Sequence, residues 1–118
     1  MYYRRKILLA LIEVFGGSLQ STDCEKLLFN FCQQTGKNHY DFFPYKYGAF
    51  SFLSYYDKRR LIELGLLKSA EDFQLNTKYS YLKELTLSDQ FAMLKFKATM
   101  GDIRGDKLVK KTYRNFPQ

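Results

Sequence analysis

The sequence of 118 residues contains no tryptophan, one histidine, two cysteines and two prolines. His39 is interpreted as a solvated turn residue, because one histidine cannot form the core of a multi-histidine metal site. Cys24 and Cys32 fall on one predicted helix about 12 Å apart, which is too far for a disulfide. A glycine-rich phosphate loop, a nucleophile elbow and a paired-cysteine zinc motif are also absent. We therefore expect a protein that is not an enzyme, with no catalytic residue, metal site or cofactor.

Long hydrophobic segments are absent as well. The longest apolar run is Ile7–Ile12, ended by Glu13, whereas a membrane span needs roughly 18 residues. The basic start Met1–Lys6 has the charge order of a secretion signal, but no small-residue cleavage site follows it, and Gly16-Gly17 predicts a helix stop. We expect an amphipathic first helix in a cytoplasmic protein with no membrane segment.

Positive charge and aromatic rings are in excess. Lysine and arginine total 19 against 12 acidic residues, for a net charge of +7, and 11 Phe with 10 Tyr make the chain 18% aromatic. A basic, tyrosine-rich small domain suggests an anionic partner, with nucleic acid as the first candidate. The competing interpretation is a basic surface that binds nothing anionic, since net charge alone shows no patch.

Hydrophobic periodicity predicts helices over residues 3–15, 22–35, 51–64, 88–100 and 106–116. Thr22 and Glu25 form a capping-box pattern, in which each side chain satisfies the other's backbone donor at the start of the second helix. Gly36 and Gly65 are expected to end the second and third helices. In the helix over 88–100, the residues expected to face inward are Phe91, Leu94 (or Met93) and Met100.

The order of these elements is that of a winged helix–turn–helix. A short hairpin wing is expected from Phe73–Leu75 and Tyr79–Leu82, joined by the turn Asn76–Lys78. We expect one α+β, mostly helical, winged-helix-like domain over residues 1–118, with three helices and the wing. Its core lies at about 1–85, and two C-terminal helices follow at about 86–118.

The primary functional hypothesis is a regulatory module that binds double-stranded DNA. In winged-helix proteins the third helix enters the major groove and the hairpin lies along phosphates. Arginine can read guanine, while lysine and hydroxyl groups hold the DNA backbone. On the third helix the leucines expected to face inward are Leu53, Leu61 and Leu64. The residues expected to contact DNA are Ser54, Tyr55, Lys58 and Arg59 on the opposite side, and Lys78 in the wing.

An aromatic segment precedes the third helix, over residues 40–50. Its rings do not fit one helix face, and Pro44 and Gly48 interrupt any helix, so an extended segment with a tight turn is predicted. Most of these rings are expected to be structural. If the domain is an interaction module, the outward rings expected to bind a protein partner are those of Tyr45 and Tyr47.

Several short motifs follow one another along the chain: Tyr3–Lys6, Lys26–Phe29, Phe43–Ser51, Asp57–Arg59, Gly65–Leu67, Arg104–Leu108 and Tyr113–Pro117. On these motifs the whole chain resembles the amino-terminal region of the bacterial domain-of-unknown-function 488 family. Members of that family continue into a carboxy-terminal domain, so the resemblance implies either the N-terminal part of a longer protein or a standalone copy.

Residues 22–67 contain a Lys-Leu-Leu-aromatic helix, a Tyr-Gly-x-aromatic-Ser turn and a terminal Gly-Leu. On these motifs they show a looser resemblance to the Panacea or SocA-like antitoxin domain. This resemblance implies the alternative function, an antitoxin-like module that neutralises a toxin or adapts proteins to a chaperone or protease. A third hypothesis is the N-terminal fragment of an enzyme whose catalytic half is missing. Neither family supplies a catalytic residue to transfer.

Overall fold

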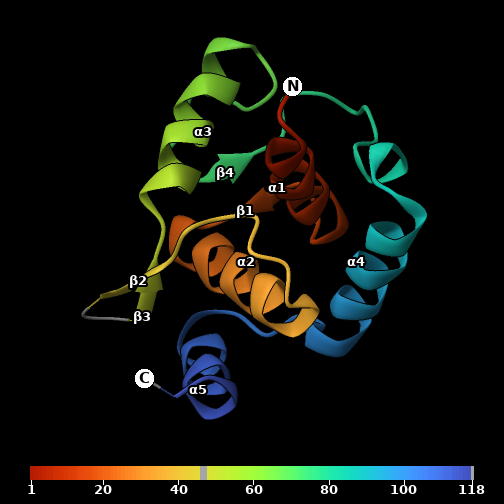
Figure 1. Ribbon diagram of the computed structural model, residues 1–118. Helices are drawn as coiled ribbons and strands as arrows, with labels where there is room; N and C mark the ends of the chain where they lie inside the picture. The colour runs from red at the N-terminus through yellow and green to blue at the C-terminus, as the bar shows by residue number, and fades with distance from the viewer. Residues whose placement is uncertain (46–47, 118) are drawn as a thin grey trace.

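The computed structural model describes residues 1–45 and 48–117 (Figure 1). The chain is α+β and mostly helical, as predicted. No helix among the described residues is both long and apolar enough to pass through a membrane. The helices are α1 (Tyr3–Val14), α2 (Ser21–Thr35), α3 (Phe52–Glu63), the short 3-10 helix η1 (Leu82–Glu84), α4 (Leu87–Met100) and α5 (Gly105–Asn115). The strands are β1 (Ser18–Leu19), β2 (Phe43–Tyr45), β3 (Gly48–Phe50) and β4 (Phe73–Gln74).

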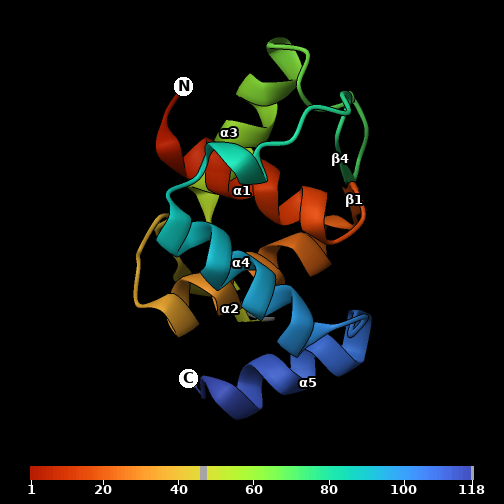
Figure 2. The ribbon, with the colours of Figure 1, turned by 90° about the vertical axis from the view of Figure 1, so that its right-hand side faces the viewer.

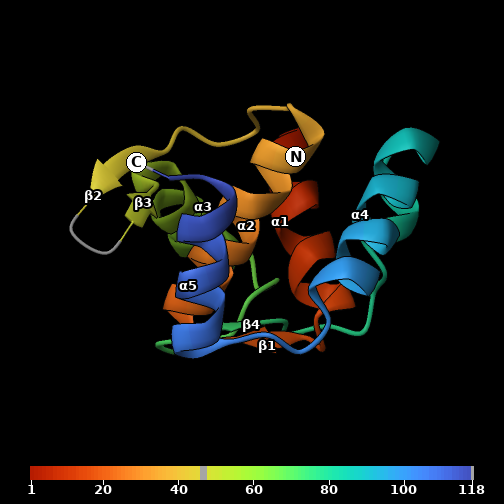
Figure 3. The same ribbon diagram turned by 90° about the horizontal axis from the view of Figure 1, so that it is seen from below.

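Helix α2 lies at the centre of the molecule, with α1, α4 and α5 packed around it (Figure 3). Every residue from Asp23 to Cys32 is buried, including four polar or charged ones, and the apolar run Ile7–Ile12 of α1 is buried beside them. Buried polar groups cost free energy unless they are hydrogen-bonded. The polar side chains of α2 must therefore find partners on the elements around it.

The predicted capping box at the start of α2 is wrong. The helix begins at Ser21 after Gln20, which makes no side-chain cap. Glu25 does not turn back along its own helix, because its carboxylate accepts hydrogen bonds from Ser51 and Ser54 at the start of α3. At the other end of α2 the prediction is confirmed: Gly36 adopts the left-handed conformation, with φ +68°, that a helix-ending glycine favours.

A small antiparallel sheet joins the segment between α1 and α2 to the segment after α3. Strand β1 pairs with β4, with Leu19 opposite Phe73. A hairpin extends this pairing: Lys68 N–H donates to the Gln74 carbonyl at 2.9 Å, and Asn76 N–H donates to the Leu66 carbonyl at 3.0 Å. The sheet therefore brings β4 back onto residues 66–68 rather than forward onto residues 79–82.

The predicted wing is consequently wrong in its pairing. Residues 82–84 form η1, and the backbone N–H of Tyr81, which was expected to take part in the hairpin with residues 73–75, is already hydrogen-bonded to a side chain of α1. The Glu13 carboxylate accepts hydrogen bonds from the Ser80 hydroxyl at 2.7 Å and from Tyr81 N–H at 2.7 Å. The hairpin that does form, over residues 66–76, carries the acidic residues Glu71 and Asp72 near its tip.

Helix α4, which lies beside α1 and α2 (Figure 2), presents a different side to the core from the one predicted. Met93, Phe96 and Met100 are buried, whereas Phe91 and Leu94 are exposed. This orientation follows from Asp89, which accepts hydrogen bonds from Tyr3 at 2.5 Å and Lys37 at 2.7 Å and so turns its side of α4 toward α1 and α2. Only Met100 and the alternative Met93 face inward as predicted.

Candidate functional site

Ser54, which is expected on the DNA-reading face of α3, is completely buried. Its hydroxyl donates to the Glu25 carboxylate, which also accepts from Ser51 N–H at 3.1 Å. Burial raises the pKa of Glu25 to about 7, and the hydrogen bonds from the two serines only partly oppose this rise. The outward placement of Ser54 is therefore wrong, because its hydroxyl is needed to satisfy a buried carboxyl group of α2.

Tyr55 and Lys58 are half-buried against the hairpin that contains β4. The Tyr55 ring stacks on Phe50, with centroids 5.2 Å apart, and meets Phe73 edge-on at 5.9 Å. The Lys58 ammonium lies 4.8 Å from the centroid of Phe73 and donates to the Glu71 carbonyl. Burial lowers the pKa of Lys58. These two side chains connect α3 to the hairpin. The prediction that they are exposed on the surface to contact DNA is therefore wrong.

Asp57, on the inner face of α3, is a second buried carboxylate beside Glu25 of α2. It accepts hydrogen bonds from Arg4 at 2.8 and 3.0 Å, from Arg5 at 2.8 Å and from the Tyr40 hydroxyl at 2.9 Å. Burial raises the pKa of this carboxyl group, but the hydrogen bonds from Arg4, Arg5 and Tyr40 outweigh it and leave the pKa below its ordinary value. This ionic cluster ties α3 to α1 and to the segment before β2, and no local sequence pattern predicts it.

The outer face of α3 is formed by the residues that point away from these two clusters. Leu61 is buried as predicted and Leu53 is half-buried, but Leu64 is exposed and does not face inward. Of the predicted DNA contacts on α3, only Arg59 is exposed. We define the outer face by its members, Phe52, Tyr56, Arg59, Arg60 and Glu63.

Three large rings stand exposed together where the outer face of α3 meets β2. Phe52 is 69% exposed, Tyr56 one turn later is 48% exposed, and Phe43 is 53% exposed. The Phe43 and Phe52 centroids are 6.2 Å apart. The sequence did not lead us to predict any of these three rings as a binding residue. A signal exists for the two on α3, because Phe52 and Tyr56, together with Arg59, follow the i, i+4, i+7 spacing of one helix face. We call Phe43, Phe52, Tyr56 and Arg59 the docking surface.

The remaining predicted contacts lie elsewhere. Lys78 is exposed in the loop after the hairpin and does not belong to it. Tyr45 lies on β2, and its side chain is outside the described part of the structure. Tyr47 lies outside the described residues altogether. The structure therefore does not bring Lys78 together with Arg59 at a wing.

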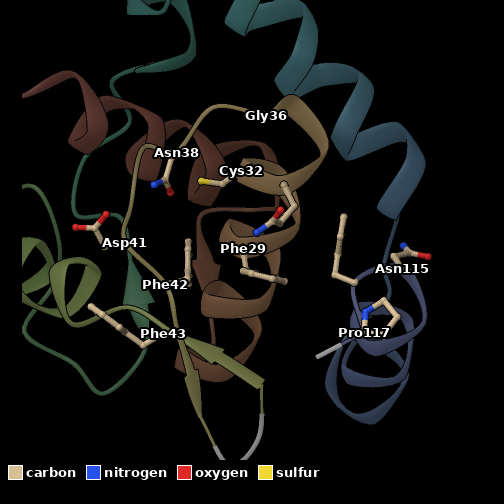
Figure 4. Close-up of a pocket in the computed structure, with 11 residues that line it drawn as sticks. Phe29, Cys32, Gly36, Asn38, Asp41, Phe42, Phe43, Asn115 and Pro117 are labelled. Atoms are coloured by element: carbon tan, nitrogen blue, oxygen red, sulfur yellow. The ribbon is translucent and has the colours of Figure 1, made fainter.

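An open groove of about 1250 Å³ adjoins the docking surface, between the end of α2 with residues 36–43 and the end of α5 (Figure 4). The Phe29 ring meets Phe42 edge-on at 5.2 Å and Phe116 at 5.7 Å, so much of the wall is aromatic. Phe43 belongs to both the groove and the docking surface. Polar lining is limited to amides, one thiol and one carboxylate: Gln33, Asn38, Asn115, Cys32 and Asp41.

The groove favours binding over catalysis. Burial raises the pKa of the Cys32 thiol, which disfavours the thiolate that nucleophilic attack requires. His39, interpreted from sequence as a solvated turn residue, is instead half-buried between the rings of Tyr3 and Phe31, and burial lowers its pKa. Aromatic walls with a few polar groups at the rim suit an apolar side chain or an extended peptide.

Possible metal ligands and similarity to known proteins are the two remaining sources of information on function. Within residues 1–45 and 48–117, no three His, Cys, Asp or Glu side chains are grouped so that they could hold a metal ion. Comparisons with protein-family models, curated proteins and solved structures find no match to this chain. The two family resemblances stay predictions, and function is inferred from the residues and their geometry.

Proposed function

We propose that the chain is a non-enzymatic protein-docking module of winged-helix-like architecture. Its binding surface is the docking surface formed by Phe43, Phe52, Tyr56 and Arg59. The observation that carries the proposal is the exposure of three neighbouring rings on α3 and β2. Tyrosine and arginine are enriched among the residues that dominate binding energy, and aromatic residues in general are enriched at interfaces.

The order of elements supports the winged-helix-like assignment. Helix α1, strand β1, helices α2 and α3, and the hairpin over residues 66–76 follow one another as in a winged helix, with the hairpin β2–β3 inserted before α3. In that arrangement α3 occupies the position of the recognition helix. Three of the four residues of the docking surface, Phe52, Tyr56 and Arg59, lie on this helix.

The chemistry of this surface favours a protein over DNA as the partner of α3. A wing that lies along DNA needs cations, but this hairpin carries Glu71 and Asp72 near its tip against one lysine, Lys68, and acidic groups repel phosphates. Arg60 is paired with Glu63 at 2.5 Å, and Lys58 is held by the hairpin. Of the three cations of α3, Arg59 is the one without an ion pair or hydrogen bond to another residue in the described ranges 1–45 and 48–117, so it is available for an intermolecular contact.

The partner's expected chemistry follows from the same residues. The three rings need an apolar surface or pocket to cover them, and Arg59 needs a carboxylate at its edge. The groove beside Phe43 adds room for an inserted side chain. An antitoxin-like role, with a toxin or another protein as partner, fits these requirements and uses exposed rings other than Tyr45 and Tyr47.

Paired serine substitutions test the docking surface. Phe52→Ser with Tyr56→Ser is expected to weaken partner binding by at least about 30-fold, since hot-spot residues contribute about 2 kcal/mol or more. The measurement is quantitative pull-down from the native cells, followed by titration of the purified partner.

The matched control removes two exposed apolar side chains from another surface. Phe91→Ser with Leu94→Ser on α4 is expected to leave partner binding within about threefold of wild type. Melting temperatures of both variants report folding. Equal losses in the two variants, or an α3 variant that keeps its partner, would reject the docking surface.

A further inference from the structure

Helix α5 carries an uninterrupted basic stripe. Its cations recur at i, i+3, i+4 and i+7, which places them on one side of a helix over a length of about 10 Å. Three of them are exposed and Lys111 is half-buried. We define the basic stripe as Lys107, Lys110, Lys111 and Arg114.

Helix α5 lies against α2 (Figure 3), and the residues that contact α2 lie on the side of α5 opposite the stripe. Leu108 is fully buried, and the Thr112 hydroxyl accepts a hydrogen bond from the Asn30 side chain at 2.8 Å. At the start of α5, Gly105 N–H donates to the Asp23 carboxylate at 2.8 Å. The apolar side of this amphipathic helix is therefore already used inside the protein and is not available for insertion into lipid.

The cations of the stripe repel one another, and Asp106, four residues before Lys110, is one opposite charge on the same helix. Like charges three or four residues apart on a helix, such as Lys107 with Lys111 and Lys110 with Arg114, repel each other. Within the described part of the chain, none of the four cations lies within 4.0 Å of a carboxylate oxygen. A local arrangement that opposes stability without an internal partner is typical of a functional surface.

The composition of the stripe favours a phosphate backbone over a protein partner. A protein interface needs an apolar anchor that becomes buried. On the side of α5 that carries these cations no apolar residue lies between them, and Tyr113 lies at the edge of this side. Phosphate contacts need charge alone. Three of the four cations are lysines, whose compact charges hold phosphates without the bidentate geometry with which arginine reads bases.

We propose that the basic stripe of α5 is a binding surface for the phosphate backbone of duplex nucleic acid, independent of base sequence. This site is separate from the docking surface on α3, so either can fail without the other. It differs from the DNA contact expected from sequence, which used α3 and Lys78.

A charge-matched comparison tests this site. The probe is a short random-sequence DNA duplex, and affinity is measured by fluorescence anisotropy at several salt concentrations from about 50 to about 200 mM. For wild type, the logarithm of the association constant is expected to fall with the logarithm of the salt concentration with a slope of about −3 to −4. Each neutralised phosphate contributes about −0.9 to this slope. The triple variant Lys107→Gln, Lys110→Gln, Arg114→Gln is expected to lose at least about tenfold in affinity and about three units of this slope.

The control variant removes the same charge from α3 and from the loop after the hairpin. Arg59→Gln, Arg60→Gln, Lys78→Gln is expected to weaken DNA binding less than about threefold, through net charge alone. The proposal is overturned if wild type does not bind the duplex at about 50 mM salt, or if the control loses as much affinity as the α5 variant. It is also overturned if poly-glutamate competes as well as DNA at equal charge, since the stripe would then recognise acidic protein.

Discussion

Asp57→Ala is expected to lower the free energy of unfolding by about 3–5 kcal/mol, because it leaves the buried Arg5 and the half-buried Arg4 without their counter-charge. Asp57 is fully buried and accepts hydrogen bonds from Arg4, Arg5 and Tyr40. Removal of one member of a buried ionic cluster costs far more than removal of an exposed pair. Urea denaturation followed by circular dichroism measures the loss.

The control for this prediction lies on the same helix. Glu63→Ala removes an exposed carboxylate that pairs only with the exposed Arg60, so a change within about 0.5 kcal/mol is expected. A loss below about 1 kcal/mol for Asp57→Ala would mean that the cluster does not hold α3 against α1. The pKa of Asp57 is lowered by folding, so its contribution is expected to be present above its unfolded pKa and lost as the pH falls through the folded value.

Glu25 is expected to have the opposite effect to Asp57 on the pH dependence of the free energy of unfolding. Burial raises its pKa from 4.5 to about 7 in the folded protein. The folded state therefore holds this proton more tightly than the unfolded state, and stability falls as the pH rises between these two values. The full fall is about 3 kcal/mol, at about 1.4 kcal/mol for each pKa unit.

Glu25→Gln removes this titration and so isolates it. Relative to wild type, the variant is expected to gain about 3 kcal/mol in unfolding free energy between about pH 4.5 and about pH 8. The titrations of His39 and Asp57 occur in both proteins and cancel in the difference. Urea denaturation at several pH values gives the curve, and a difference that does not change with pH would contradict the burial of an ionisable group beside Ser54.

Local sequence signals predicted the helices well. The apolar run of α1 marks a buried helix, Ser51 caps α3 by accepting from Ser54 N–H at 3.2 Å, and Gly65 ends α3. After Gly65 the chain folds back over the helix end, since the Leu66 N–H donates to the Leu61 carbonyl at 2.9 Å. These features depend on residues a few positions apart, which is the range over which sequence patterns carry structural information.

The rotation of α3 was not predictable in the same way. It is set by Glu25 and by Arg4, whose partners Ser54 and Asp57 lie 29 and 53 residues away in the sequence. Hydrophobic periodicity assigns the polar Ser54 to the surface and Leu64 to the core, whereas Ser54 is buried and Leu64 is exposed. The buried carboxylates of Glu25 and Asp57 thus set which side of α3 faces inward, while Leu61 stays buried as predicted.

The pairing of the β-strands failed for a related reason. Residues 73–75 read as a strand, but sequence does not specify whether the partner precedes or follows them. The structure pairs them with residues 66–68 and with β1, while Glu13 binds the backbone at Tyr81. A long-range hydrogen bond again decided between two locally acceptable arrangements.

Site-specific photo-crosslinking in the native cells tests the docking surface most directly. Phe52 and Phe91 are replaced, one at a time, by a photoreactive phenylalanine analogue. The two positions are matched in residue type and exposure, at 69% and 72%, but lie on different helices. Irradiation is expected to link position 52 to one discrete protein and to give no such product at position 91. A discrete adduct at position 91 with none at position 52 would contradict the assignment of partner binding to α3.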